Sequence, residues 1–97
     1  MLKKNKGNLS DLLRDGATII DVRSEREFAN GSFLNSINIP LQQIEQDVEM
    51  LKLKQPIVLC CGSGMRSSMA VTALKKIGIS EVYNGGSWEK LEGQLTK

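Results

Sequence analysis

The sequence contains no histidine and only two cysteines, and this shortage excludes several kinds of site. Without histidine the chain has no Ser–His–Asp or Cys–His–Asn nucleophile system and no metal site with an imidazole ligand. The two cysteines, Cys60 and Cys61, are adjacent, so no long-range disulfide joins them. Two thiols are also too few for a metal site built from this chain alone, and we therefore expect no bound metal.

Aromatic residues are also scarce, and neither sign of charge predominates. Thirteen Lys and Arg residues oppose eleven Asp and Glu residues, which gives a net charge of +2, and the aromatic residues are one Trp, one Tyr and two Phe. The tight basic cluster of Lys3, Lys4 and Lys6 is interpreted as a solvated tail. Because nucleic-acid binding typically needs a basic stripe interleaved with aromatic residues, we expect no nucleic-acid partner.

Long apolar runs are the third shortage. The longest run, residues 57–61, is far below the ~20 residues of a membrane-spanning helix, so we expect no membrane partner. The basic start of the chain is not followed by the apolar segment of a signal peptide. The sequence therefore predicts a cytoplasmic protein, and it leaves open that an export signal has been removed.

The length and composition fit one globular domain. Ninety-seven residues with 40% hydrophobic residues can form a single core without disulfides. We expect this domain to cover residues 1–97, with residues 1–8 as a basic N-terminal segment that is truncated or flexible.

Apolar spacing, capping residues, glycine and proline predict helices and strands that alternate along the chain. Helices are expected at residues 9–13, ended by Gly16; from the capping box of Ser24 and Glu27 to about residue 30; along an apolar face at residues 41, 44, 48 and 51; at residues 70–77, ended by Gly78; and around Trp88 and Leu91. Strands are expected at residues 18–22, 37–39, 57–60 and 81–83, with a loop at residues 62–64 and a turn at residues 85–86. This order predicts an α/β fold with a central, mostly parallel sheet of four to five strands and helices on both faces.

A glycine-rich loop between a predicted strand and a predicted helix carries the strongest signal of chemistry. Residues 61–67 read Cys-Gly-Ser-Gly-Met-Arg-Ser, and the N–H groups of such a loop can converge on one anion. The helix N-terminus and the guanidinium of Arg66 add positive charge, and these three features together lower the pKa of a cysteine at the mouth of the loop. The pattern predicts a thiolate nucleophile at the mouth of the loop, with Arg66 as its catalytic partner. The remaining loop residues form the predicted substrate- or anion-binding set, which is Gly62, Ser63, Gly64, Met65 and Ser67.

The distance in sequence between cysteine and arginine leaves two chemistries open. Four residues separate Cys61 from Arg66, and five separate Cys60 from Arg66. The longer spacing, Cys-x5-Arg-Ser, is the signature of protein tyrosine phosphatases and fits a phosphoryl group, whereas a tighter loop fits a single transferred sulfur. Loop length alone does not choose between them.

Four motifs follow one another at intervals along the chain. They are Ile19-Ile20-Asp21-Val22-Arg23 followed by Glu27-Phe28, residues 31–40, residues 61–67, and Tyr83-Asn84-Gly85-Gly86. In this order they resemble the motifs of single-domain rhodaneses, a family of thiosulfate:cyanide sulfurtransferases, over nearly the whole chain. The resemblance implies a rhodanese-like fold, a sulfurtransferase activity, Cys61 as the residue that carries a persulfide, and a packing role for Cys60. It also implies a small-molecule sulfur donor, a thiol, cyanide or protein acceptor of sulfur, and no metal or organic cofactor.

Residues around this loop are expected to support it. Asp21 ends a buried strand, where an unpaired carboxylate is costly, so we expect it to accept backbone N–H bonds. Arg23 and Glu27 are four residues apart and are expected to pair with each other. Trp88 is expected to anchor the core. Ser32 stands where the resembled family has histidine, which predicts different polarity or packing at that point.

Two alternatives to a free-standing sulfurtransferase stay open. One is a persulfide carrier, or sulfur-relay module, that serves a protein partner. The other, less favoured, is a cysteine-dependent phosphatase or arsenate reductase, because the loop from Cys61 to Arg66 is the shorter one and no general acid is evident.

Overall fold

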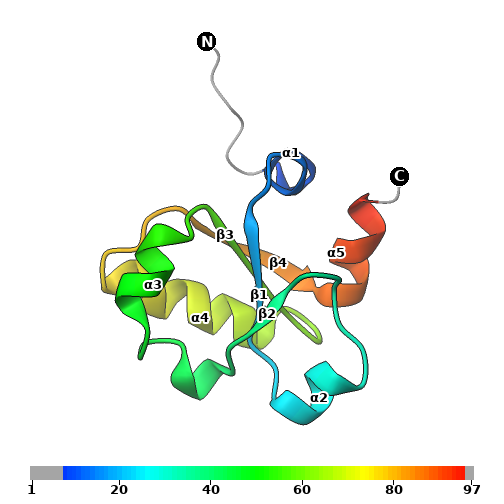
Figure 1. The fold of residues 1–97 in the computed structure, drawn as a ribbon, viewed down its shortest axis with the longest axis horizontal. Helices are drawn as coiled ribbons and strands as arrows, with labels where there is room; N and C mark the ends of the chain where they lie inside the picture. Colours follow the sequence, from blue (N-terminus) through cyan, green and yellow to red (C-terminus); the bar gives the residue numbers. More distant parts are fainter. Residues whose placement is uncertain (1–7, 96–97) are drawn as a thin grey trace.

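The structure, a computed structural model, describes residues 8–95 (Figure 1). Its elements are, in order, α1 (Leu9–Arg14), β1 (Thr18–Asp21), α2 (Glu25–Ala29), β2 (Ile37–Asn38), the 3₁₀ helix η1 (Leu41–Gln43), α3 (Val48–Leu53), β3 (Ile57–Cys61), α4 (Met65–Lys76), β4 (Val82–Ser87) and α5 (Trp88–Leu95). The predicted basic segment, residues 1–8, lies outside the described residues except for Asn8. Among the helices of residues 8–95, none is long and apolar enough to cross a membrane.

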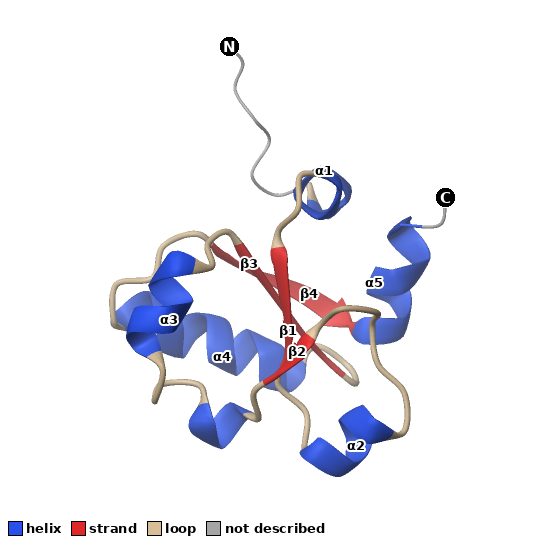
Figure 2. Cartoon of the chain, in the orientation of Figure 1, coloured by secondary structure: helices blue, strands red, loops and turns tan. Residues whose placement is uncertain are grey.

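Four parallel strands form one sheet in the order β2-β1-β3-β4 (Figure 2). The chain passes from β1 outward to β2 and from β3 outward to β4, so its direction reverses between the two central strands. Binding sites in open parallel sheets form beyond the carboxyl ends of the strands at such a reversal. Because Asp21 ends β1 and Cys61 ends β3, both Asp21 and the loop that starts at Cys61 lie at that edge.

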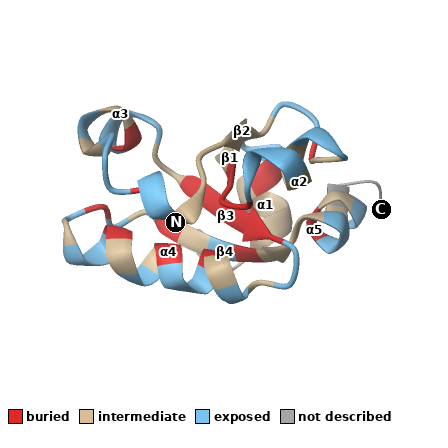
Figure 3. Ribbon diagram, turned by 90° about the horizontal axis from the view of Figure 1, so that it is seen from below, coloured by how far each residue is buried: buried red, intermediate tan, exposed pale blue. Residues whose placement is uncertain are grey.

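The central strand β3 is buried over its whole length, and its residues alternate between two cores (Figure 3). Ile57, Leu59 and Cys61 pack in the core that α3 and α4 cover. Val58 and Cys60 pack in the opposite core, which α1 and α5 cover. The predicted α/β fold with a parallel sheet and helices on both faces is therefore confirmed.

The helix α2, which follows β1 at the carboxyl edge of the sheet, begins with the predicted capping box. The Ser24 hydroxyl accepts the backbone N–H of Glu27 at 3.2 Å, and the Glu27 carboxylate accepts the backbone N–H of Ser24 at 3.0 Å. A cap of this kind contributes about 0.5–2 kcal/mol. It fixes where the Glu27 side chain leaves the helix, which matters at the site described below.

The single helix predicted across residues 41–51 is wrong. The structure has the 3₁₀ helix η1, a turn, and then α3, which begins after Asp47. Asp47 has a non-helical backbone conformation, with φ −119° and ψ 48°, and its side chain makes no capping hydrogen bond, so the segment is divided there without a capping signal. Ile44 and Leu51 nevertheless reach the same core, which explains why their spacing resembled one helical face.

The turn predicted at Gly85-Gly86 is also wrong, because both glycines lie inside β4. The pairing of β4 with β3 shifts register beside them, between Leu59 and Cys60. A Cβ on Gly85 would lie 2.7 Å from Cγ1 of Val58 and 3.1 Å from the carbonyl oxygen of Leu59. Gly85 is therefore required by close approach of two strands rather than by a turn.

Candidate active site

The predicted loop is a tight strand-to-helix connection. β3 ends at Cys61 and α4 begins at Met65, so only three residues join them, two of which are glycine. Gly64 has φ +104°, a conformation that favours glycine, and a Cβ there would lie 3.3 Å from Cα of Gly86. The loop thus closes against β4, and this close contact brings its N–H groups back toward the end of β3.

The Cys61 sulfur lies inside this loop. Its Sγ accepts the backbone N–H of Gly64 at 3.0 Å and of Ser67 at 3.4 Å, and the Ser67 Oγ lies 3.5 Å away. Burial alone would raise the pKa of the Cys61 thiol, but the Ser67 hydroxyl and the N–H groups of Ser67, Gly64 and Ser63 outweigh it. The pKa of Cys61 is therefore below its ordinary value, as expected for a thiolate nucleophile.

Cys60 has a different environment from its neighbour. Its side chain packs on the opposite face of the sheet, with Leu13 of α1 and Leu91 of α5. Burial and the negative charge of Asp21 raise the pKa of Cys60 to about 12. Cys60 is therefore a neutral thiol in the core, and this position fits the packing role that the resemblance implied.

Arg66 is held at the loop by a carboxylate from α2. Its Nη1 and Nη2 donate to the two carboxylate oxygens of Glu27 at 2.8 Å and 3.0 Å. The contact with Arg66, together with the Ser24 cap, lowers the pKa of Glu27 to about 2. The contact with Glu27 raises the pKa of Arg66. The guanidinium lies beside the loop, since a Cβ on Gly62 would be 3.7 Å from Nη2. The predicted pairing of Glu27 with Arg23 is therefore wrong.

Arg23 instead pairs with Asp21 at the end of β1. The guanidinium donates to both carboxylate oxygens of Asp21 at 2.8–3.0 Å, and Asp21 Oδ1 accepts the backbone N–H of Arg23 at 3.0 Å, as predicted for that carboxylate. Arg23 also donates to the carbonyl of Gly31 at 2.6 Å and lies 5.0 Å from the ring centroid of Trp88. Asp21 and Arg23 are both buried. They tie β1 to the segment before β2 and to α5, which is a supporting role.

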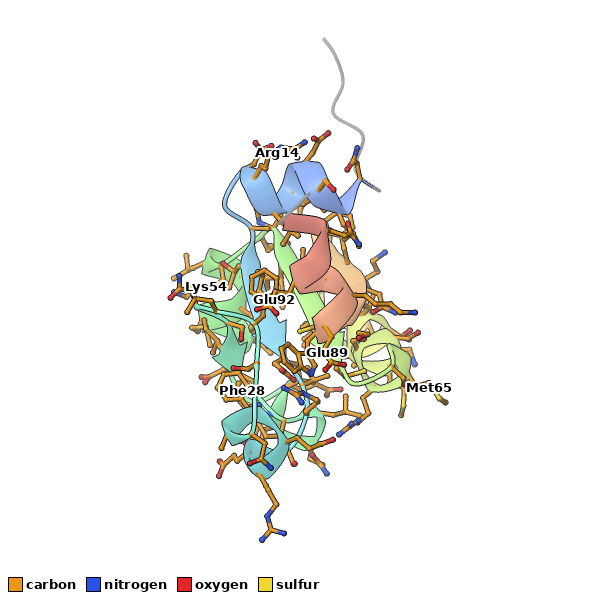
Figure 4. The ribbon with its side chains drawn as sticks, turned by 90° about the vertical axis from the view of Figure 1, so that its right-hand side faces the viewer. Arg14, Phe28, Lys54, Met65, Glu89 and Glu92 are labelled. Atoms are coloured by element: carbon orange, nitrogen blue, oxygen red, sulfur yellow. The ribbon has the colours of Figure 1, made fainter. Side chains whose placement is uncertain are left out.

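The rim of the loop is exposed. Gly62, Ser63 and Met65 are exposed, and Met65 is 74% exposed. Figure 4 shows Met65 projecting outward from the start of α4. A partner molecule that approaches Cys61 from solvent would meet this rim.

Asn84 of β4 is a site residue that the sequence analysis quoted in a motif but did not single out. Its Oδ1 accepts the Ser67 hydroxyl at 2.7 Å and the backbone N–H of Gly86 at 2.9 Å, and its Nδ2 donates to the carbonyl of Gly64 at 3.2 Å. No local sequence pattern predicts the contacts with Ser67 and Gly64, because these residues are 17 and 20 positions away from Asn84 in the chain.

The site thus consists of a cysteine whose sulfur accepts backbone N–H groups, and it lies where the strand order of a parallel sheet changes direction. These features define the class of the protein as an α/β domain with a cysteine at the centre of its loop. The model of the family "Rhodanese-like domain" matches residues 5–93, and the chain belongs to that family.

Named relatives and a solved structure agree with this assignment. The chain is 32% identical over 69 residues to the thiosulfate sulfurtransferase GlpE of Stutzerimonas stutzeri (strain A1501), covering 71% of this chain and 63% of that protein. It is 33% identical over 70 residues to the putative sulfur carrier protein YrkF of Bacillus subtilis (strain 168), covering 72% of this chain and 38% of that protein. The chain thus spans less than two thirds of the length of these two relatives. The crystal structure of a rhodanese-related protein from Thermoplasma volcanium superimposes with a TM-score of 0.71 at 28% identity, covering 97% of this chain and 93% of that one.

Proposed function

We propose that the chain is a sulfurtransferase that moves a sulfane sulfur from thiosulfate or a persulfide donor to a thiophilic acceptor through a persulfide on Cys61. The observation that carries the proposal is the Cys61 sulfur itself, which accepts N–H groups from Gly64 and Ser67. Those contacts lower the pKa of Cys61 below its ordinary value, which favours the reactive thiolate.

Two displacement steps would move the sulfur. The Cys61 thiolate attacks the outer sulfur of thiosulfate, the S–S bond of the donor breaks, and sulfite leaves with the bonding electron pair. The acceptor, a thiolate or cyanide, then attacks the outer sulfur of the Cys61 persulfide, and the Cys61 thiolate is restored. This is covalent catalysis with a stored intermediate, and neither step needs a metal or an organic cofactor.

The loop and the start of α4 support negative charge in both steps. The backbone N–H groups of the loop and the N-terminus of the twelve-residue helix α4 face the sulfur that carries charge. We assign Arg66 a second contribution, because its guanidinium adds positive charge beside Gly62. Its pairing with Glu27 offsets part of that charge and fixes the guanidinium in place.

A sulfur carrier for one protein partner is the second candidate function. This alternative is supported by the relative YrkF, which is named a putative sulfur carrier protein. The phosphatase alternative has less support, because Cys60, which has the phosphatase spacing to Arg66, packs in the opposite core.

The proposed setting is the cytoplasm, with a small sulfur donor and either a small thiol or a protein as acceptor. Both cysteines are free thiols in the structure. A reducing compartment keeps such thiols available, which supports this setting.

Intact mass measured after thiosulfate treatment tests the proposal. We expect wild type and Cys60→Ser to gain the mass of one sulfur atom, and Cys61→Ser to gain none. Sulfur on Cys61→Ser but not on Cys60→Ser would contradict the assignment of Cys61, and sulfur on no variant would exclude thiosulfate as donor.

Acceptor turnover separates the two candidate functions. An enzyme loses its persulfide rapidly to cyanide or to a small thiol, with many turnovers. A carrier forms the same persulfide but retains it in the presence of those acceptors. Arg66→Ala should slow persulfide formation in either case, because it removes the charge beside the loop.

A further inference from the structure

The Ser67 hydroxyl faces more acceptors than it has hydrogens to donate. Its Oγ lies 2.7 Å from Oδ1 of Asn84, 3.2 Å from the carbonyl of Gly64 and 3.5 Å from Sγ of Cys61. A hydroxyl carries one hydrogen and two lone pairs, so only one of these three atoms can receive that hydrogen. The shortest contact is the one to Asn84.

The amide of Asn84 is fixed so that it can only accept from Ser67. The backbone N–H of Gly86 can only donate, and it points at Oδ1. The carbonyl of Gly64 can only accept, and it receives Nδ2. These two contacts determine which amide atom is oxygen, and that oxygen faces the Ser67 hydroxyl.

We infer that Asn84 is a positioning residue for the nucleophile: it takes the Ser67 hydrogen, turns an oxygen lone pair of Ser67 toward Cys61, and thereby favours the protonated thiol. In that state the Cys61 S–H donates to Ser67 and the Ser67 O–H donates to Asn84. When Cys61 loses its proton, the Ser67 hydrogen turns to the sulfur and the contact with Asn84 is lost. The inference rests on the proposed nucleophile, Cys61.

This arrangement gives Asn84 a function opposite to that of the loop N–H groups. The N–H groups of Gly64 and Ser67 stabilise the thiolate and cannot reorient. The hydroxyl can reorient, and Asn84 opposes its turn toward the sulfur. A thiol held partly protonated is also less prone to oxidation between turnovers, because the thiolate is the form that oxidants attack.

Replacement of Asn84 by alanine should therefore lower the pKa of Cys61. Without Oδ1, the remaining acceptors of the Ser67 hydrogen are the Gly64 carbonyl and the sulfur, and a charged thiolate is the stronger acceptor. We expect a decrease of about half to one pKa unit, the size of one ordinary hydrogen bond. Asn84→Asp should raise the pKa, because a carboxylate still accepts from Ser67 and adds negative charge near the sulfur.

Other charges around Cys61 stay in place in these variants. They are Arg66 of α4, Glu27 of α2 that pairs with it, and the Asp21–Arg23 pair at the end of β1. Cys60, whose pKa the charge of Cys61 raises, is also unchanged in these variants, and its thiol lies on the other face of the sheet. A shift of the Cys61 midpoint therefore reports the Ser67 hydroxyl and the residue at position 84.

The test is an NMR titration of protein carrying isotope-labelled cysteine, in wild type, Asn84→Ala, Asn84→Asp, Ser67→Ala and the Asn84→Ala/Ser67→Ala double variant. The Cys60 signal is an internal reference, and Asn30→Ala, at an exposed residue that ends α2, is the control substitution. We expect a lower Cys61 midpoint in Asn84→Ala, a higher one in Asn84→Asp, and no further shift when Asn84→Ala is added to Ser67→Ala. An unchanged or higher midpoint in Asn84→Ala, or an equal shift in the Ser67→Ala background, overturns the inference. Because the readout is titration, the proposed sulfur transfer can fail without affecting this result.

Discussion

Glu27 makes both a local contact, with Ser24, and a long-range contact, with Arg66. Its carboxylate caps α2 through the backbone N–H and hydroxyl of Ser24, and it also holds both terminal nitrogens of Arg66 on α4. The capping box could be predicted from the sequence because its residues are three positions apart. The contact with Arg66 could not, because the two residues are 39 positions apart and meet only through the sheet.

The pKa of Glu27 gives the first prediction at this scale. The folded protein lowers that pKa from 4.5 to about 2, chiefly through Arg66. A carboxyl group with a lowered folded-state pKa stabilises the fold above its ordinary pKa and loses that contribution as the pH falls through the lower value. We therefore expect the Glu27–Arg66 contact to persist at pH 4.5 and to be lost as the pH approaches 2.

An NMR titration of the Glu27 side-chain carboxyl measures this midpoint directly. In Arg66→Met the midpoint should rise toward 4.5 but stop short of it, because the contacts with Ser24 remain. Arg14→Gln is the control, since Arg14 pairs with Asp11 on α1 instead. A midpoint that is the same in wild type and Arg66→Met would show that the two side chains do not pair in solution.

The element that sets the shape of the site is β4, through its two glycines. Gly85 lies so close to β3 that a Cβ would be 2.7 Å from Val58 Cγ1, 3.1 Å from the Leu59 carbonyl oxygen and 3.1 Å from Leu91 Cδ2. The methyl groups can shift, but the carbonyl belongs to the central strand and cannot move without breaking its pairing. Gly86, with φ +79°, then lies against Gly64 of the loop.

Gly85→Ala should destabilise the protein by about 1–3 kcal/mol, the usual cost of overpacking a core. Gly93→Ala in α5 is the matched control, because a Cβ there meets nothing within 4 Å. That change should stabilise the protein by about 0.5–1 kcal/mol through helix propensity. Urea unfolding measures the free energy of unfolding of each variant, provided that the dependence on urea concentration (the m-value) is the same as in wild type. A Gly85→Ala variant as stable as wild type would contradict the close approach of the two strands.

Elements whose signals are local were predictable, whereas elements shaped by tertiary packing were not. The buried strand β3 and the end of α1 before Gly16 follow from apolar runs and glycine, and the structure confirms both. The break at Asp47 and the place of Gly85 and Gly86 inside β4 depend on tertiary packing, and propensity does not carry that information. The loop at Cys61 was predictable because its signal is local: the residues that form it are seven consecutive positions, 61–67.

At the scale of the whole molecule, one buried ion pair joins segments that the sheet alone does not hold together. Asp21 ends the central strand β1, and Arg23 extends from it to the carbonyl of Gly31 and to the ring of Trp88 on α5. The Asp21 side chain is fully buried and that of Arg23 is 8% exposed. This pair therefore connects the centre of the sheet to the segment before β2 and to the last helix.

Arg23→Ala should cost about 3–5 kcal/mol, because it leaves the Asp21 carboxylate buried without its charged partner. A domain of this size has about 5–15 kcal/mol of total stability, so this loss is a large fraction of it. Arg14→Ala is the control, since its pair with Asp11 is exposed and should contribute no more than about 1 kcal/mol. Where Arg23→Ala does not fold at all, the double variant Asp21→Leu/Arg23→Met removes both charges together and should recover much of the stability. Urea unfolding of the four proteins measures these differences, and a loss below 1 kcal/mol in Arg23→Ala would show that the pair does not link these segments.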